Sequence, residues 1–420
     1  MALSRRRFVA GGLVGCGACC AAPSWPAVLS TTFKDTIGLD YEPLDDDERG
    51  LWHASDQLER GLVESDLVLK SADLNGYVVG VVERLLDHPA DDLRIYVVRD
   101  ARFNATMAPN GLMVVHTGFL ARAQNEAQLA SVLGHEAGHY FGRHTIERWR
   151  SVRRMSAAAA FAGAAANAAA GYTALQGHNG QSWIDIANAI NYGLVLSMFS
   201  YSRGQESEAD AYGIARLASG GYPTTAAAAV WRQLIEERQA SAAARDKDYR
   251  DKALSVFSTH PPNAERMKDL ADTAVALETD VVVGSQTDHG RERWVAAREP
   301  FFAALLEEQV KLNDPGASLY LLDMHAQDGW TGTLRYYEGE TYRLRGADGD
   351  PKRAADAYAA AVTLDDAPAE AWRAHGYALI KQDRREDGRA ALSRYLELKP
   401  QAADAAMVRY SLDQQGLPPP

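Results

Sequence analysis

Three side chains between Asn125 and His144 have the types and the spacing of a metal-dependent hydrolytic site. His135 and His139 are four positions apart, and Glu136 follows the first of them, in the pattern HExxH. Apolar residues recur at helical spacing just before the pattern, and Asn125 is a suitable N-terminal cap. On a helix the two imidazoles project from one face, one turn apart. This arrangement suits two ligands of one zinc ion, with Glu136 placed to act on a water molecule.

The pattern leaves one protein ligand of the metal to be found. In the extended pattern HExxHxxGxxH the third ligand is a histidine, and Gly142 stands where that pattern has its glycine. The last position is Thr145, however, and His144 lies one place early, about 100° away around a helix. We therefore exclude this completion and interpret His144 as a surface residue.

A downstream glutamate is the other source of a third ligand. The run from Ser202 to Asp210 follows a helix-like segment, and within it Glu206 and Asp210 share a helical face. Glu206 could complete a His-His-Glu site, and Asp210 could accept a hydrogen bond from the outer nitrogen of a ligand histidine. Glu208 points elsewhere on the same helix.

Three segments, taken in order, resemble the zinc metallopeptidase family of HtpX and the CAAX prenyl endopeptidases. They are the HExxH stretch, the ExEAD run at 206–210 and the run at 258–266. HtpX-like members have clear membrane helices, which this sequence does not show, so exported BepA-like members with a C-terminal repeat domain are the better match. The resemblance implies that His135, His139 and Glu206 bind zinc and that Glu136 is the catalytic base. It also implies that Asp210 supports the ligands from behind and that His260 lies close to the metal.

His260 precedes the pair Pro261 and Pro262 and has two functional interpretations. It could donate a hydrogen bond to the negatively charged oxygen of the tetrahedral intermediate. Alternatively, it could reach the open metal position and keep the enzyme latent until its loop moves. The sequence favours neither interpretation, although the two prolines restrict how the loop leaves the site.

The elements before the zinc helix must position it. Residues 45–86 show apolar residues at helical spacing, up to a break at residues 88–92. We expect the buried side of this helical stretch to include five leucines, namely Leu51, Leu58, Leu62, Leu67 and Leu69.

Residues 94–98 and 112–116 are rich in β-branched residues and predict two strands, and residues 103–107 could form a third. An exposed edge strand could hold an extended peptide beside the metal by backbone pairing. A sheet that only packs against the helix explains the pattern equally well.

Composition narrows the class of protein. A chain of 420 residues predicts two or three domains, and a net charge of -12 argues against a nucleic-acid partner. The three cysteines, Cys16, Cys19 and Cys20, all lie near the N-terminus. Metal ligands in the rest of the chain must therefore be His, Asp or Glu.

Residues 1–30 have the layout of an export signal. Arg5 to Arg7 precede a short apolar run and resemble the twin-arginine signal. Leu13 to Cys16 also resemble a lipobox, in which cleavage would leave Cys16 as a lipidated N-terminus. We expect an exported protein that is either located in the periplasm or anchored to the membrane as a lipoprotein facing the periplasm.

The overall fold is predicted to be mainly α, with a small β-sheet beside the active-site helix. We expect a zincin-like α+β peptidase domain over residues 31–278, connecting helices over residues 279–332, and an all-α tetratricopeptide-repeat-like domain over residues 333–420. The repeat is indicated by a period of 34 residues, in which Ala354, Tyr358, Ala361 and Leu364 recur as Gly388, Leu392, Tyr395 and Leu398.

These features favour an exported zinc endopeptidase with one ion per subunit, acting on misfolded or unassembled envelope proteins. Zinc would polarise the scissile carbonyl, and Glu136 would take a proton from the attacking water and pass it to the leaving amine. The alternative is a chaperone or assembly factor for envelope proteins that binds them through its repeat domain and has latent protease activity.

Overall fold

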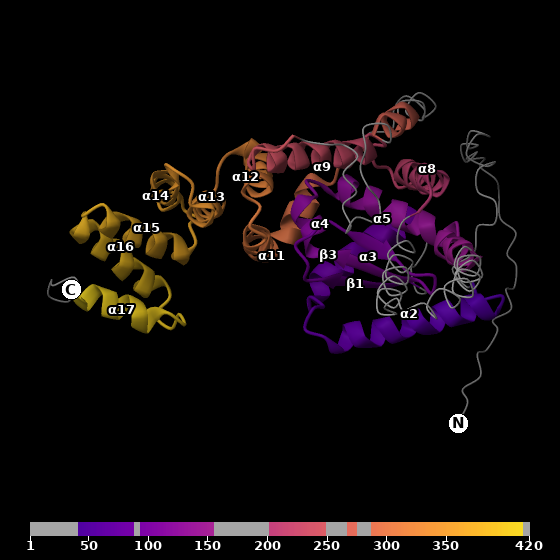
Figure 1. Cartoon of the computed structure of the whole chain (residues 1–420), viewed down its shortest axis with the longest axis horizontal. Helices are drawn as coiled ribbons and strands as arrows, with labels where there is room; N and C mark the ends of the chain where they lie inside the picture. Colours follow the sequence, from indigo (N-terminus) through magenta and orange to yellow (C-terminus); the bar gives the residue numbers. More distant parts are fainter. Residues whose placement is uncertain (1–40, 88–92, 155–200, 249–266, 275–286, 415–420) are drawn as a thin grey trace, which may run out of the picture.

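The computed structural model describes most of the chain, over residues 41–87, 93–154, 201–248, 267–274 and 287–414. The predicted export signal with Cys16 and the predicted site residue His260 lie outside these ranges. The described part is mainly helical with one small sheet, as predicted (Figure 1). None of the helices in these ranges is both long and apolar enough to cross a membrane.

Three strands form the sheet, in the order β1-β3-β2. β1 (Arg94–Val98) and β3 (Leu112–His116) occupy the two predicted stretches and run parallel. β2 (Ala105–Met107) pairs antiparallel with β3 and covers only the end of the predicted third strand. The turn between β2 and β3 contains Gly111, whose φ of 85° is a conformation that glycine adopts without strain. The strand order leaves β2 at an edge of the sheet.

The predicted helical stretch over residues 45–86 is two helices. α2 (Asp46–Glu64) begins after the cap Asp45, and α3 (Ala72–Leu86) begins after the cap Ser71. Between them the chain passes the sheet, where Val68 forms a bridge to Val98. The backbone thus leaves the helical conformation to satisfy a strand partner, a competition that periodicity alone does not reveal.

The prediction for the buried side of this stretch is wrong at Leu58 and Leu67, which are 62% and 54% exposed. Polar contacts hold this part of α2 instead. Glu59 accepts a hydrogen bond of 2.7 Å from Arg94 of β1, and Asp56 accepts one of 2.7 Å from Asn110. The polar face of α2 is therefore the one turned toward the sheet.

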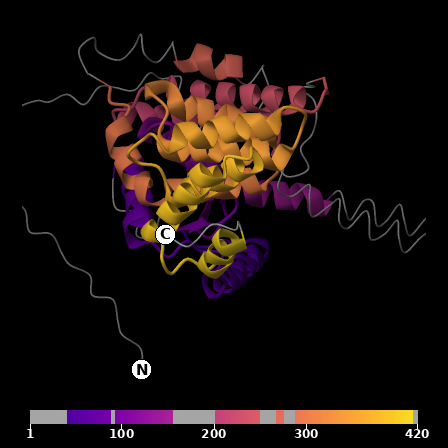
Figure 2. The ribbon, with the colours of Figure 1, turned by 90° about the vertical axis from the view of Figure 1, so that its left-hand side faces the viewer.

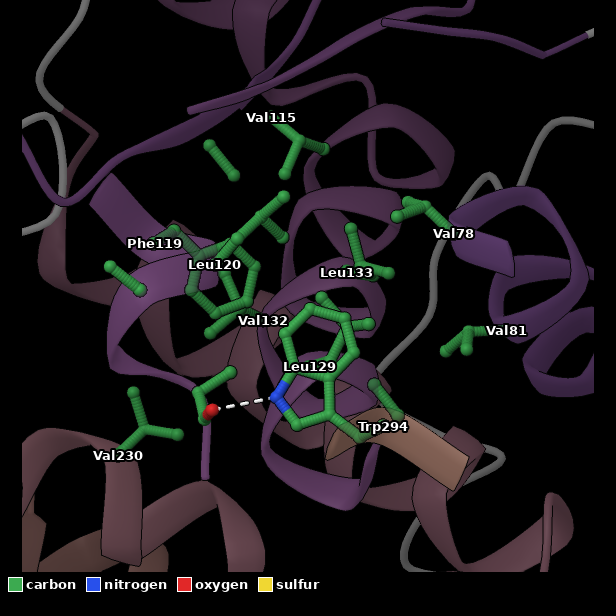
Figure 3. Packing of buried hydrophobic residues seen from close by; sticks show 14 of the residues in the cluster. Val78, Val81, Val115, Phe119, Leu120, Leu129, Val132, Leu133, Val230 and Trp294 are labelled. Atoms are coloured by element: carbon green, nitrogen blue, oxygen red, sulfur yellow. Dashed lines mark hydrogen bonds between the residues drawn. The ribbon is translucent and has the colours of Figure 1, made fainter. Parts of the chain in front are cut away.

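The main hydrophobic core surrounds the helix that carries HExxH, α5 (Glu126–Phe141), which is buried along its whole length. Figure 3 shows Leu129 and Leu133 of α5 packed among side chains of α3, β3 and α4 (Thr117–Arg122). Trp294 of α11 (Arg291–Lys311) closes this core, and its Nε1 donates a hydrogen bond of 2.6 Å to the carbonyl of Ala123. Residues far apart in sequence thus fix the entry to α5.

Three more helices pack around this core: α8 (Arg203–Ser219), α9 (Ala226–Ala243) and α12 (Pro315–His325). α8 and α9 pack against α5, and α12 packs against α9. A buried ion pair joins α4 to α9, because Arg122 donates two hydrogen bonds of 2.7 and 2.6 Å to Glu237. Arg122 also donates to Gln309 of α11 at 2.8 Å, so side chains of two other helices satisfy its charge.

The helices α13 to α17, which follow α12, extend away from this body at the C-terminal end and face the viewer in Figure 2. They form two hairpins and a last helix, namely α13 (Gly332–Arg345) with α14 (Asp350–Ala361), α15 (Ala369–Lys381) with α16 (Arg385–Leu398), and α17 (Ala405–Gln414). Within the second hairpin, Gly376 lies against Leu392, which is fully buried. The tetratricopeptide-like character of these hairpins stays a prediction.

Candidate metal centre

α5 begins and ends at points that set the position of its histidines. The side chain of Asn125 accepts a hydrogen bond of 2.9 Å from the backbone of Gln128 and caps the helix, as predicted from its sequence position. The helix ends at Phe141. Within it, His135, Glu136 and His139 are 5%, 2% and 1% exposed, so their polar atoms must find partners inside the protein.

The two imidazoles of α5 and the carboxylate of Glu206 on α8 converge on one point. Nε2 of His135 lies 3.1 Å from Nε2 of His139, and the Glu206 oxygens lie 3.5 and 3.7 Å from these two nitrogens. Zinc bonds of about 2.0–2.1 Å in tetrahedral geometry separate neighbouring ligand atoms by about 3.3 Å. The donor set and its spacing therefore fit a zinc ion held by these three buried residues.

Glycine and alanine residues at the crossing of α5 and α8 allow Glu206 to reach the histidines. A Cβ added to Gly138 would lie 2.9 Å from Cα of Ala209, and one added to Gly213 would lie 3.0 Å from the backbone nitrogen of His135. The two backbones thus approach more closely than side chains would allow. Gly134 and Gly138, like Ala209 and Gly213, are four positions apart, a signal that the sequence analysis missed.

Asp210 supports one ligand from behind. Its carboxylate lies 2.8 Å from Nδ1 of His135, on the side of the ring away from Glu206. A carboxylate in this position accepts the Nδ1 hydrogen and leaves the Nε2 lone pair for the metal. Glu206 and Asp210 share a face of α8, at the helical spacing noted in the sequence.

His144 is not a surface residue, contrary to the sequence interpretation. It is fully buried, and its Nδ1 lies 2.9 Å from Nδ1 of His139. The sequence interpretation assumed that the helix continues through residue 144. Arg143 instead has a φ of 58°, a left-handed conformation that turns the chain after α5 and brings His144 back under His139.

Glu208 is also close to the centre. Its carboxylate lies 3.2 Å from Nε2 of His144, while its own side chain remains 49% exposed. Burial lowers the pKa of His144, and the nearby carboxylate of Glu208 only partly offsets this effect. The ring of His144 thus lies between the ligand His139 and the carboxylate of Glu208.

Tyr201 covers the other ligand histidine and was not identified from the sequence. Its ring stacks on His139 with centroids 3.8 Å apart and an angle of 18° between the planes. Its hydroxyl lies 2.9 Å from that of Thr145, and burial raises the pKa of this phenol well above its ordinary value. The ring therefore acts as a neutral wall that restricts the orientation of His139.

A cavity borders the metal centre on the side of Glu136 and His135. β2 and the residues before it form one wall, and α5, α8, α9 and the helical segment at residues 267–274 form the others. The side chains that give the cavity its apolar character are Phe103, Val132, Ile214, Ala227, Trp231 and Leu270. Glu136 thus meets a space with apolar walls next to an edge strand.

The fold and the site together fit the class of zinc-dependent peptidases, because the buried group of His135, His139 and Glu206 could hold a metal ion. The model of peptidase family M48 matches residues 69–274, which include α3, the sheet, α5 and α8. Residues 69–274 are therefore a peptidase family M48 domain, as the resemblance of the three segments predicted.

Individual relatives support the same assignment. The chain is 28% identical over 272 residues to the "Putative beta-barrel assembly-enhancing protease" of Vibrio cholerae, covering 61% of this chain and 51% of that protein. It is 29% identical over 199 residues to the mitochondrial metalloendopeptidase OMA1 of Schizosaccharomyces pombe, covering 47% and 52%. It is 25% identical over 216 residues to the beta-barrel assembly-enhancing protease of Escherichia coli, covering 51% and 41%. The matched part thus spans about half of each relative or less, and these names support assignment as a zinc metalloendopeptidase.

Proposed function

We propose that the protein is an exported zinc endopeptidase that cleaves misfolded or unassembled proteins of the cell envelope. The observation that carries this proposal is the convergence of His135, His139 and Glu206 beside the buried carboxylate of Glu136. When bound, zinc supplies a Lewis acid that polarises a peptide carbonyl. Glu136 takes the proton of the attacking water and delivers it to the nitrogen of the leaving amine.

The edge strand β2 supports an extended substrate. The backbone N–H of His116 donates to the carbonyl of Asn104, and the N–H of Ala108 donates to the carbonyl of Leu112. In an antiparallel pair, residues that bond to the partner strand alternate with residues that do not. The backbone groups of Ala105 therefore face the free edge of the sheet. Asn104 and Ala105 also line the cavity next to Glu136. A peptide paired to this edge would pass the metal in an extended form, with one apolar side chain in the cavity. Unfolded chains present such segments readily.

The envelope as the site of action rests on the predicted export signal and on the names of the relatives. Two of them are named as β-barrel assembly-enhancing proteases, which suggests substrates among envelope proteins. Lipidation at Cys16 and the two roles considered for His260 remain part of the proposal. Mass spectrometry of the mature protein, isolated from cell envelopes, would test the first of these.

The substitution Glu136→Gln tests the mechanism. It preserves the three ligands, so the variant should bind zinc with unchanged stoichiometry. Loss of the base should reduce casein cleavage by at least about a hundredfold, the lower range for general acid–base catalysis. Wild-type cleavage in a zinc-loaded Glu136→Gln preparation would contradict the mechanism, and so would a wild-type protein that binds no zinc.

A second function, assembly of envelope proteins without cleavage, is favoured by the C-terminal helices. α15 to α17 share an apolar cluster of their own, while Met407 and Tyr410 of α17 are 65% and 63% exposed. Under this function, Glu136→Gln should restore a deletion strain as well as wild type does, whereas the double variant Met407→Ser and Tyr410→Ser should not. The opposite pattern identifies proteolysis as the activity that the cell requires.

A further inference from the structure

A chain of hydrogen-bonding groups runs from the metal centre to the surface. It starts at the ligand His139, passes through the buried ring of His144 over 2.9 Å, and ends at the exposed carboxylate of Glu208 over 3.2 Å. The other ligand, His135, has a shorter support, because Asp210 contacts its Nδ1 directly. The two ligand histidines are thus held in two different ways.

The chemistry of the last group fixes the hydrogen positions along this chain. An ionised carboxylate only accepts hydrogen bonds, so Nε2 of His144 must carry its hydrogen toward Glu208. A neutral imidazole has one hydrogen, and Nδ1 of His144 is therefore an acceptor. Nδ1 of His139 must then donate to it. The remaining nitrogen of His139, Nε2, keeps its lone pair and faces Nε2 of His135 and the carboxylate of Glu206.

The local backbone is arranged to place His144 in this chain. The left-handed turn at Arg143 directs the chain back toward α5. Gly142 leaves room for the ring, because a Cβ at that position would lie 2.9 Å from Cδ2 of His144. Tyr201 stacks on the opposite partner, His139, and limits its rotation. The turn at Arg143, the glycine at position 142 and the stacked ring of Tyr201 all favour the contact between His144 and His139.

We propose that His144 and Glu208 are positioning residues that select the metal-binding tautomer of His139. The proposal rests on the zinc function proposed above, but it concerns a hydrogen position that can be measured without metal. Glu208 acts at a distance, since the group it contacts is a ring that does not itself bind the ion. An exposed carboxylate thereby influences a buried ligand.

The first test measures tautomers in the full-length, zinc-free protein labelled with ¹⁵N-histidine. Long-range ¹H–¹⁵N spectra distinguish Nδ1–H from Nε2–H rings, and the variant His144→Leu assigns the signal of His144. We expect the Nε2–H tautomer for His144 and the Nδ1–H tautomer for His139. The reverse assignment in the wild-type protein would overturn the proposal, whether or not the protein proves to be a peptidase.

The second test measures zinc affinity by competition with a chelator. Glu208→Lys places a donor where an acceptor is required, and Glu208→Ala removes the acceptor, so both should weaken zinc binding about 10–100-fold, as other losses behind a metal ligand do. Glu208→Gln retains an accepting oxygen and should stay within about threefold of wild type. An unchanged affinity in Glu208→Ala and Glu208→Lys would overturn the role of Glu208.

Glu147→Lys is the matched control for charge. Glu147 is exposed and acts on His144 only through its field, without a hydrogen bond to that ring among the described contacts. Its reversal from -1 to +1 equals that of Glu208→Lys, so we expect zinc affinity within about threefold of wild type. Equal losses in the two lysine variants would show that charge alone is responsible and would contradict the tautomer mechanism.

Discussion

The two ends of α5 each bury charged groups, but they satisfy them differently. At the first turn, the carboxylate of Glu126 accepts hydrogen bonds from two arginines and two tyrosines, namely Arg84, Arg293, Tyr77 and Tyr222. At the last turns, His135 and His139 meet the carboxylate of Glu206 with three ligand atoms pointing at one spot. The first end is a closed structural site, and the ligand atoms of the second are arranged as they would be to hold a cation. Burial of charge alone therefore does not identify a functional site, whereas the direction of the lone pairs does.

Removal of the metal should affect only the second end, and it has the largest expected effect on activity. Dialysis against a chelator removes the ion and should abolish casein cleavage. The substitution His139→Ala should have the same effect, because the two remaining ligands hold zinc poorly. Cleavage should return on addition of zinc to the dialysed wild type but not to His139→Ala. Full activity in a preparation shown to be metal-free would refute the distinction between the two ends.

The substitution Glu126→Gln should break the first end and leave the second intact. Loss of one partner from a fully buried ion pair costs about 3–5 kcal/mol. Arg84 and Arg293 are 41% and 45% exposed and can be rehydrated, so we expect a smaller loss of about 2 kcal/mol. Urea unfolding measures it, and zinc affinity should remain that of the wild type. A variant that folds normally yet loses zinc would show that the two ends are coupled.

The pH dependence of stability should also show the role of Glu126 at the first turn of α5. Burial alone would raise the pKa of Glu126, but the hydrogen bonds from Arg293, Tyr77 and Tyr222 outweigh it and lower this pKa. A carboxyl whose pKa is lowered on folding contributes stability above its unfolded pKa, and this contribution is lost as the pH falls through the folded value. The unfolding free energy of the wild type should therefore fall more steeply below pH 4.5 than that of Glu126→Gln. Parallel curves would contradict this role for Glu126.

The substitution Gly138→Ala tests the helix crossing that the second end requires. The new methyl group would meet backbone atoms of Ala209, its Cα at 2.9 Å and its oxygen at 3.0 Å, and neither can rotate away. α8 must shift and carry Glu206 with it, so we expect zinc affinity to fall about tenfold and stability to fall by about 1–3 kcal/mol. Chelator competition and urea unfolding measure the two effects. An unchanged zinc affinity would show that Glu206 can follow the histidines when the helices separate.

The sequence predicted the residue pairs of the metal centre that lie at helical spacing. His135 with His139 and Glu206 with Asp210 are four positions apart, so each pair could be placed on one face, and the structure brings both pairs to the centre. The interpretation of His144 was wrong because a left-handed residue other than glycine, Arg143, has no clear sequence signal.

The contacts of Glu126 at the first turn of α5 could not be predicted from the sequence. The partners of Glu126 include Arg84, Tyr222 and Arg293, which lie 42, 96 and 167 positions away. No local pattern links residues at such separations, and only tertiary packing brings them together. The exposure of Leu58 was unpredictable for a similar reason, since the polar side of α2 found distant partners on the sheet.

The substitution Gly80→Ala should have the smallest effect and the opposite sign. Gly80 lies inside α3, and a Cβ at this position would meet no atom within 4 Å. Alanine reduces the freedom of the unfolded chain and favours the helix, so we expect a gain of about 0.5–1 kcal/mol in unfolding free energy, with zinc affinity unchanged. The same chemical change, glycine to alanine, should therefore stabilise α3 and damage the crossing of α5 with α8. If urea unfolding showed equal losses in Gly80→Ala and Gly138→Ala, helix flexibility rather than close contact would explain the glycines of the metal centre.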